Sequence, residues 1–233
     1  MNEAVVAFVH AKGTSDRVPG KNLRLLGDCP LFCHAIAAAR EASLVDRVVI
    51  DSDCDEILRV GAAHGAVPLK RSPSLATNRT TGDDLACWQA SSYPDSQIVL
   101  QVVPTSPFLK PESVDRAVAL LREESVDSVV GVFSDVFYLW KDGRPAYFRP
   151  DGSIPNSFEI EPLVYETTGL YVNRTEFVLR HRKRVNPASC VLLGLSRLEA
   201  VDINTEEDFN FAEIVWKGIQ SAKVLLPLSG TSR

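Results

Sequence analysis

The sequence lacks an excess of positive charge and has no long apolar run. Its 233 residues include 25 Lys and Arg against 30 Asp and Glu, which gives a net charge of −5. General binding to nucleic acid requires a basic face, and a membrane-spanning helix requires about 20 consecutive apolar residues. The first residues also lack the charged start, apolar run and small-residue cleavage site of a signal peptide. We therefore expect a cytoplasmic protein that binds neither nucleic acid nor membranes.

The cysteines do not form a regular set of pairs. Secreted disulfide frameworks and zinc sites usually contain pairs at repeated spacings. A metal cluster of Cys29, Cys33 and His34 lacks a fourth ligand nearby, and this segment has the pattern of an apolar helix. The cysteines therefore indicate reduced thiols. There are five of them: Cys29, Cys33, Cys54, Cys87 and Cys190.

Apolar runs alternate with helical segments along the first part of the chain. The run AVVAFVHA (4–11) is continuous and rich in Val, which is typical of a parallel strand buried on both faces. Further strands are predicted at 47–51, 66–70 and 97–103, each followed or preceded by a helical pattern. This alternation predicts an α/β fold with a three-layer, doubly wound, mostly parallel sheet, in one domain over residues 1–233. Ligands of such sheets bind at the carboxyl ends of the strands.

The pattern changes at residues 134–165, which are rich in Gly, Pro and aromatic residues. We interpret them as a β-rich excursion from the main sheet. Its aromatic residues form either an interface or a small local core: Phe137, Tyr138, Trp140, Tyr147 and Phe148.

After the excursion, the sequence predicts a strand in PLVYETTGLYVN and a helix in RTEFVLRHRKR, whose basic end (180–184) we interpret as solvent-exposed. SRLEAVD is the predicted last strand. TEEDFNFAEIVWKGI is the predicted last helix, begun by a capping pair of Thr205 and Asp208. The residues after Lys223 read as a loose tail.

The segment HAKGTSDRVPGKN (10–22) is similar to a phosphate-binding loop but breaks the Walker pattern. Six residues, not four, separate Gly13 from Gly20, and Asn22 stands where Ser or Thr would follow Lys21. The segment lacks the GxGxxG pattern of a dinucleotide site as well. Even so, Lys12, Arg17 and Lys21 supply charge beside glycines that permit close backbone approach. We favour a phosphate-binding loop over the alternative of a solvated charged loop.

Residues 11–15 (AKGTS), with Arg17, Pro19, Lys21 and Asn22, resemble the first motif of the sugar-acid cytidylyltransferases. These are the acylneuraminate (CMP-sialic acid) synthetases and their relatives that act on legionaminic, pseudaminic and KDO-type acids. The resemblance continues to about residue 215 in RVVIDSDCDEI, KRSPSLATNRTTGDDL, VVPTSPF and LEAVDINTEEDF.

The resemblance implies a Rossmann-like nucleotide-diphospho-sugar transferase fold that transfers CMP from CTP to a sugar acid and releases pyrophosphate, for surface-glycan biosynthesis. It also implies Mg²⁺ or Mn²⁺ as cofactor, and a homodimer in which residues 134–165 pack against the second subunit.

The resemblance also assigns roles to residues. Lys12, Arg17 and Lys21 stabilise the leaving pyrophosphate. The expected nucleotide-binding residues are Ala11, Lys12, Gly13, Ser15, Lys21, Asn22, Arg71 and Asp84. The expected substrate-binding residues are Gln101, Thr105, Ser106, Glu166 and Thr168, and the expected metal ligands are Asp202 and Asn204.

This sequence departs from the family pattern at several positions. Lys12 replaces the usual Arg, and Asn204 replaces the second metal-binding acid. Val103 stands where relatives often have Gln. The Arg expected to grip the sugar-acid carboxylate is missing between residues 156 and 169, and its candidate replacements are Lys141, Arg144 and Arg149. No general base stands out. The alternatives are a CMP-KDO-type or other NTP–sugar nucleotidyltransferase and a nucleotide-binding pseudoenzyme.

Overall fold

The computed structural model describes residues 4–146, 148, 149, 151 and 153–225. Within these residues the chain forms a seven-stranded sheet in the order β11-β7-β10-β6-β1-β4-β5. All neighbouring strands pair in parallel except β10, which is antiparallel to both β6 and β7. The strands are β1 (Val5–His10), β4 (Arg47–Ser52), β5 (Val67–Lys70), β6 (Ile98–Val102), β7 (Ser128–Asp135), β10 (Leu163–Arg174) and β11 (Cys190–Gly194).

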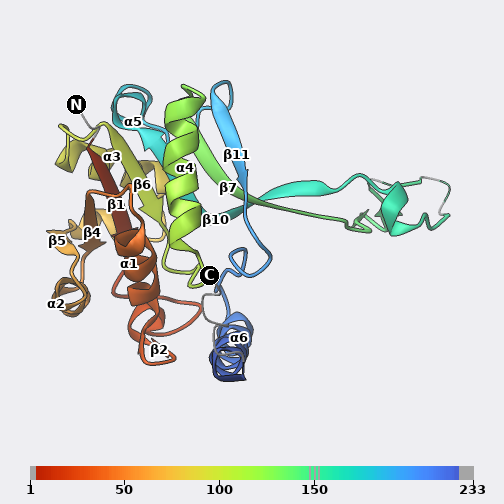
Figure 1. Cartoon of the computed structure of the whole chain (residues 1–233), viewed down its shortest axis with the longest axis horizontal. Helices are drawn as coiled ribbons and strands as arrows, with labels where there is room; N and C mark the ends of the chain where they lie inside the picture. Colours follow the sequence, from red (N-terminus) through yellow and green to blue (C-terminus); the bar gives the residue numbers. More distant parts are fainter. Residues whose placement is uncertain (1–3, 147, 150, 152, 226–233) are drawn as a thin grey trace, which may run out of the picture.

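Helices cover both faces of the sheet, which confirms the predicted three-layer architecture (Figure 1). One face packs against α1 (Leu31–Glu41), α2 (Asp55–Ala63) and α4 (Pro111–Glu123). The other packs against α3 (Gly82–Ser92) and α5 (Thr175–His181). Alternate residues of β1 serve the two faces, since Val5, Ala7 and Val9 join the first core and Val6 and Phe8 the second.

The last helix, α6 (Glu206–Leu225), lies beyond the carboxyl ends of the strands, below the sheet in Figure 1. Its buried Phe209 and Ala212 share a small core with Leu26 and Leu31. The predicted capping pair is confirmed, because the Asp208 carboxylate accepts from the Thr205 amide at 2.8 Å and the Thr205 hydroxyl accepts from the Asp208 amide at 3.2 Å. The remaining elements are short: η1 (Lys21–Leu23), β2 (Leu25–Leu26), β3 (Cys29–Pro30), η2 (Pro73–Leu75), β8 (Trp140–Lys141), β9 (Arg144–Pro145) and η3 (Ser157–Glu159).

The prediction of a last strand in SRLEAVD is wrong. The last strand is β11, and residues 197–200 form a turn. Glu199 explains the difference, because its buried carboxylate accepts from the Ser196 hydroxyl at 2.7 Å and from the Lys110 amide at 3.2 Å. A side chain that bonds locally and to a helix N-terminus satisfies the backbone without a strand partner.

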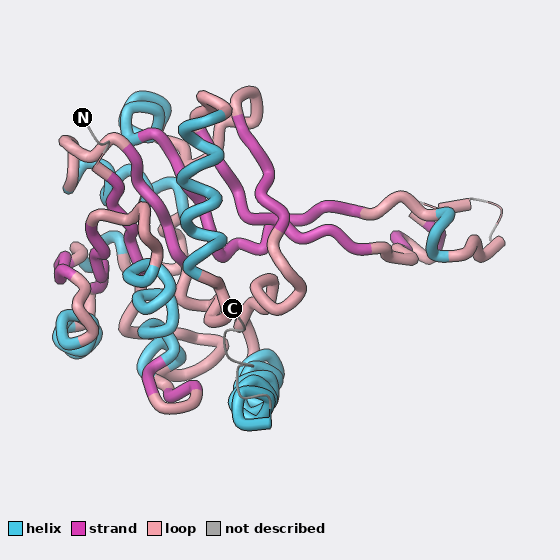
Figure 2. Tube along the Cα trace, in the orientation of Figure 1, coloured by secondary structure: helices cyan, strands magenta, loops and turns pink. Residues whose placement is uncertain are grey.

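The described residues between 134 and 165 form an arm that extends far from the body of the molecule (Figures 1 and 2). The ladder between β7 and β10 reaches Asp135 and Leu163, and β8, β9 and η3 follow toward the tip. Apolar side chains on the arm remain exposed: Trp140 by 62%, Ile154 by 79% and Phe158 by 83%. The treatment of this arm as an insertion in one domain stays a prediction. Tyr147 and most of the expected tail, from residue 226 onward, lie outside the described residues.

No helix in the described part of the chain is both long enough and apolar enough to cross a bilayer.

A row of five polar side chains, four of them buried, crosses the sheet on the α3 face, near the carboxyl ends of the strands. Arg71 donates to Asp51 through Nε–H···Oδ1 at 2.8 Å, and the two side chains are 3% and 0% exposed. Gln89 of α3 donates to the other carboxylate oxygen at 2.9 Å, and Gln101 of β6 donates to Gln89 at 2.9 Å. Arg184 reaches Gln101 Oε1 at 3.4 Å. We call these five residues the polar row.

Replacing Asp51 by Ala should leave the Arg71 guanidinium buried without its counter-charge. We expect the free energy of unfolding to fall by about 3–5 kcal/mol in urea titrations. The control is Asp55→Ala, which removes an exposed pair with Lys70 and should cost less than about 1 kcal/mol. Equal losses of unfolding free energy in the two variants would show that the buried pair contributes no more to stability than the exposed pair.

Candidate active site

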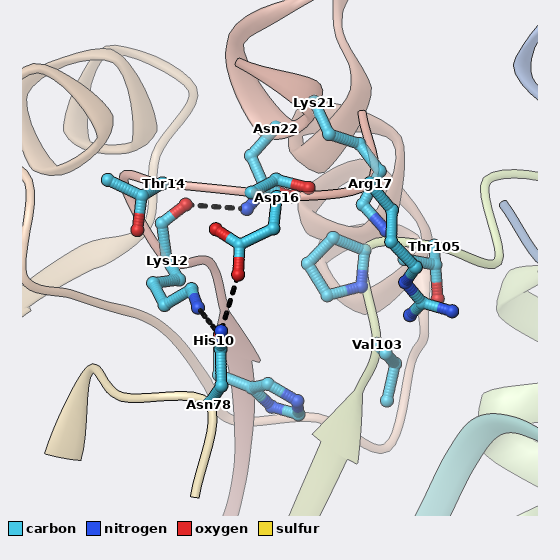
Figure 3. A pocket seen from close by; sticks show the side chains of 12 residues that line it. His10, Lys12, Thr14, Asp16, Arg17, Lys21, Asn22, Asn78, Val103 and Thr105 are labelled. Carbon is cyan, nitrogen blue, oxygen red and sulfur yellow. Dashed lines mark hydrogen bonds between the residues drawn. The ribbon is translucent and has the colours of Figure 1, made fainter. Parts of the chain in front are cut away.

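A pocket of about 540 Å³ opens at the carboxyl ends of β1 and β6. It lies where ligands bind in sheets of this kind. The close-up in Figure 3 shows its lining, to which the segment after β1 contributes most of the side chains. The lining residues are His10, Lys12, Thr14, Ser15, Asp16, Arg17, Lys21, Asn22, Asn78, Val103, Pro104 and Thr105.

Hydrogen bonds between side chains and backbone atoms of the loop after β1 hold this loop in place. The Gly13 amide donates to the Asp53 carboxylate at 2.9 Å, and Asn22 Nδ2 donates to the Lys12 carbonyl at 2.8 Å. A Cβ on Gly13 would lie 2.8 Å from the Cβ of Cys54, so only glycine fits this approach. Gly20 adopts a left-handed conformation with φ +63° just before η1. The loop therefore has a defined conformation. The Asn22 side chain stabilises it through the bond to the Lys12 carbonyl instead of pointing freely into the pocket.

The three expected phosphate ligands all line the pocket, but on two sides (Figure 3). Lys12 Nζ donates to Asn78 Oδ1 at 2.6 Å on one side. On the other, Arg17 Nη2 donates to Asn204 Oδ1 at 2.7 Å and Lys21 Nζ donates to the Ile203 carbonyl at 2.7 Å. Burial lowers the pKa of Lys21, and the nearby Asp202 acts in the opposite direction. The pocket is thus bounded by cations on both sides.

Asp202 and Asn204 are distant from the loop after β1 in the sequence but lie next to it in the fold. Asn204 Nδ2 donates to Asp202 Oδ2, while Asp202 Oδ1 is buried and has no hydrogen-bond partner among the described residues. An unpartnered buried carboxylate oxygen suits a hard divalent cation. The described residues contain no group of three or more His, Cys, Asp or Glu side chains that would hold a metal by themselves. The two residues therefore fit a cation whose other ligands come from phosphate and water.

Among the five expected substrate-binding residues, Thr105 is the only one that lines the pocket. Its carbonyl accepts from the Ile203 amide at 2.9 Å. Ser106 Oγ is buried with no partner in the described part of the chain, and a Cβ on Gly169 would lie 2.5 Å from it. Thr168 sits in a β-bulge with φ +59°, a strained conformation for a β-branched residue.

Two further predicted residues, Glu166 and Gln101, are bonded to other side chains. Glu166 accepts from the Tyr171 hydroxyl at 2.8 Å. Gln101 is 3% exposed and belongs to the polar row. The expectation that all five residues contact the substrate stays a prediction.

Four predicted nucleotide ligands are not among the residues that line the pocket: Ala11, Gly13, Arg71 and Asp84. Ala11 is fully buried beneath the loop. Arg71 lies in the polar row, with its guanidinium bonded to the side chain and carbonyl of Asp51. Asp84 belongs to the capping box of α3, whose N-cap is Thr81, and it accepts from the Thr81 amide and hydroxyl at 2.8 and 2.7 Å, which lowers the pKa of Asp84.

The sequence analysis missed His10 as a pocket residue. It ends β1, and its ring points toward Val103 in the pocket (Figure 3). Its Nδ1 is buried and has no hydrogen-bond partner within the described residues. Burial, followed by the charges of Arg71 and Arg184, lowers the pKa of His10 from 6.5 to about 3. The available signal for this position was a polar residue at the end of an otherwise apolar strand, where ligands bind in such sheets.

The interpretation of residues 180–184 as a solvent-exposed helix end is wrong for Arg184. Helix α5 ends at His181, and Arg182 takes a left-handed conformation with φ 54° that turns the chain back. Arg184 is half-buried, and its guanidinium carbon lies 3.8 Å from the centre of the Tyr171 ring. This turn contains no glycine, the residue that usually marks a left-handed helix end, so it was not predictable from the residue types.

Comparison with known proteins identifies the family. The profile described as Cytidylyltransferase matches residues 6–146. The CMP-N,N'-diacetyllegionaminic acid synthase of Legionella pneumophila subsp. pneumophila is 31% identical over 234 residues, which cover 94% of this chain and 99% of that protein. The chain belongs to the cytidylyltransferase family, as its motifs predicted.

More distant relatives match over part of their length. N-acylneuraminate cytidylyltransferase A of Danio rerio is 29% identical over 59% of this chain, which spans only 32% of that protein. The N-acylneuraminate cytidylyltransferase of Streptococcus agalactiae serotype V is 23% identical over 88% of this chain and 51% of that protein.

A solved structure supports the fold assignment. The structure of CMP:2-keto-3-deoxy-manno-octonic acid synthetase complexed with CTP has a TM-score of 0.70 and 13% identity, over 93% of this chain and 99% of that one. At this identity the likeness shows the fold alone.

The lowered pKa of His10 predicts an acid-sensitive stability. The folded state keeps His10 neutral, whereas the unfolded chain binds a proton at its ordinary pKa of 6.5. The unfolded state therefore binds more protons below pH 6.5, so stability is lost as the pH falls from 6.5 toward 3. We expect His10→Asn to lose less stability than the parent between pH 7 and pH 4 in urea titrations. The control His64→Asn, at an exposed imidazole, should follow the parent, and identical slopes for all three proteins would contradict the assignment.

Proposed function

We propose that this protein transfers CMP from CTP to a sugar acid of the sialic or nonulosonic type and releases pyrophosphate, as a step in surface-glycan biosynthesis. The observation that carries the proposal is the pocket at the carboxyl ends of β1 and β6, with cationic side chains on both sides and the unpartnered Asp202 oxygen beside them. The named activity of the Legionella relative, matched along 99% of its length, supports the same acceptor class.

The reaction requires alignment and charge neutralisation more than covalent catalysis. A hydroxyl oxygen of the sugar acid attacks the α-phosphorus of CTP, the bond to the bridging oxygen breaks, and pyrophosphate leaves with the electron pair. Lys12, Arg17 and Lys21 line the pocket, and in this proposal they neutralise the charge that grows on the pyrophosphate. The hydrogen bonds within the loop after β1 keep these three side chains in position before CTP binds. This lowers the entropic cost of aligning them with the phosphates.

Asp202 and Asn204 would hold Mg²⁺ or Mn²⁺ in this proposal. Asp202 supplies the negative charge through its unpartnered Oδ1, while Asn204 supplies only a carbonyl oxygen, which now accepts from Arg17. When bound, the metal would supply Lewis-acid stabilisation of the charge on the phosphates.

Pyrophosphate release tests the proposed function directly. CTP, UTP, GTP and ATP are each incubated with Mg²⁺ and with sialic, KDN, legionaminic, pseudaminic and KDO acids. We expect release with CTP and one or more of the sialic or nonulosonic acids. Release with KDO alone or with another nucleotide favours a different nucleotidyltransferase. No release with any pair contradicts the proposal and favours a nucleotide-binding pseudoenzyme.

Lys21→Ala removes a buried cation from the pocket and should lower kcat by about 100-fold or more. The matched control is Lys217→Ala, which removes an exposed lysine on α6 and should retain the parent rate. Equal rates in the two variants, with both folded by circular dichroism, would remove Lys21 from the catalytic machinery.

We propose that the protein is a homodimer assembled through the arm. Its exposed Trp140, Ile154 and Phe158 form more apolar surface than a lone arm is expected to leave in water. Sedimentation should give twice the mass of the chain, and Phe158→Asp should shift the species toward the monomer. The control Leu25→Asp changes an exposed apolar residue on the body and should stay dimeric. A monomeric parent at micromolar concentration would contradict this assembly.

A further inference from the structure

Arg184 is a half-buried cation without a matching anion. Its guanidinium stacks on Tyr171 with the carbon 3.8 Å from the ring centre, and Nη1 donates to Gln101 Oε1 at 3.4 Å. No Asp or Glu oxygen lies within ion-pair distance of it in the described part of the chain. By contrast, Arg71 in the same polar row is neutralised by Asp51 at 2.8 Å. A partly desolvated charge of this kind is costly unless a bound anion completes it.

The position of Arg184 is fixed by its surroundings. The Arg184 amide donates to the Asp83 carboxylate at 3.0 Å, and the Asn186 amide donates to Ser128 Oγ at 2.9 Å. A Cβ on Gly82 would lie 2.3 Å from Arg184 Nη1, so the absence of a side chain there makes room for the guanidinium. A pre-positioned, planar guanidinium is suited to a carboxylate, which it binds through two parallel hydrogen bonds.

Arg184 is not among the residues that line the pocket, but it is connected to the pocket through Gln101. Gln101, its hydrogen-bond partner, is two residues before Val103 on the strand that leads into the pocket lining. His10, another lining residue, is close enough for the Arg184 charge to help lower its pKa. Lys12 and its partner Asn78 lie toward the opposite side of the pocket from Val103 (Figure 3).

The basic residues first considered for the sugar-acid carboxylate are placed less well. Lys141 and Arg144 belong to β8 and β9 of the arm, which carries them away from the pocket of the same chain (Figure 1). Arg149 is already paired with Glu159 at 3.1 Å.

We propose that Arg184 binds the carboxylate of the acceptor and thereby selects sugar acids over neutral sugars. This inference rests on the proposed function, since it assigns the acceptor end of the same site. In this arrangement the carboxylate lies on the guanidinium edge, with the Tyr171 ring behind it. The acceptor hydroxyl then faces the nucleotide phosphates, which the loop after β1 holds on the other side of the pocket.

The test compares the parent with Arg184→Ala, Arg184→Lys and the control Lys183→Ala, which removes the exposed neighbouring charge. The acceptor is the best acid from the pyrophosphate assay and, in parallel, its carboxamide. For Arg184→Ala we expect KM for the acid to rise about 10- to 100-fold while KM for CTP stays within about twofold. The parent should prefer the acid over the carboxamide, and this preference should disappear in Arg184→Ala. Arg184→Lys should retain part of it, and Lys183→Ala all of it.

An unchanged preference for the acid in Arg184→Ala would overturn the inference, as would an equal rise in both KM values. Calorimetric binding of the same acids in the presence of CMP separates this result from failure of the proposed function. If no acid is turned over but one binds to the parent and not to Arg184→Ala, the anion site stands and the transferase proposal falls. If no acid binds to the parent, the anion site falls as well.

Discussion

The buried ion pair between Asp51 and Arg71 fixes the edge of the sheet on which the site is built. Asp51 accepts from Arg71 and Gln89 through its two carboxylate oxygens, and its carbonyl accepts from the Ala11 amide at the start of the loop. One residue thus joins β4, the end of β5, α3 and the loop after β1. Because burying either charge without the other costs several kcal/mol, the pair disfavours arrangements that separate these elements. The polar row then continues through Gln101 to Arg184.

The pocket itself joins segments from opposite ends of the chain. Lys21 bonds to the Ile203 carbonyl and Arg17 to Asn204, while the Ile203 amide donates to Thr105. These contacts bring the cationic loop beside the Asp202 carboxylate, so one region offers the groups that the proposed reaction needs for both phosphate and a divalent metal. In the same proposal the acceptor carboxylate lies at Arg184.

Much of this architecture was predictable from the sequence, for identifiable physical reasons. Continuous Val-rich runs such as residues 4–11 specify strands buried on both faces, and Thr205 with Asp208 specifies a helix start. The position of the loop cations at the pocket was predictable, because basic residues beside glycines after the first strand are typical of a phosphate-binding loop. SRLEAVD was misassigned because Glu199 makes its bonds across the chain to Lys110, which spacing does not reveal. The partial burial of Arg184 was not predicted, because Arg182 adopts a left-handed conformation without being a glycine and turns Arg184 toward the sheet.

The position of bond cleavage in CTP tests the central claim most directly. Phosphorus NMR of the parent enzyme with CTP, Mg²⁺ and the sugar acid follows every phosphate in one sample. If the loop holds the β- and γ-phosphates and the acid attacks the α-phosphorus, the spectrum gains a CMP phosphodiester and free pyrophosphate in equal amounts. Formation of CDP with inorganic phosphate, or of free CMP with pyrophosphate and no phosphodiester, would contradict the account.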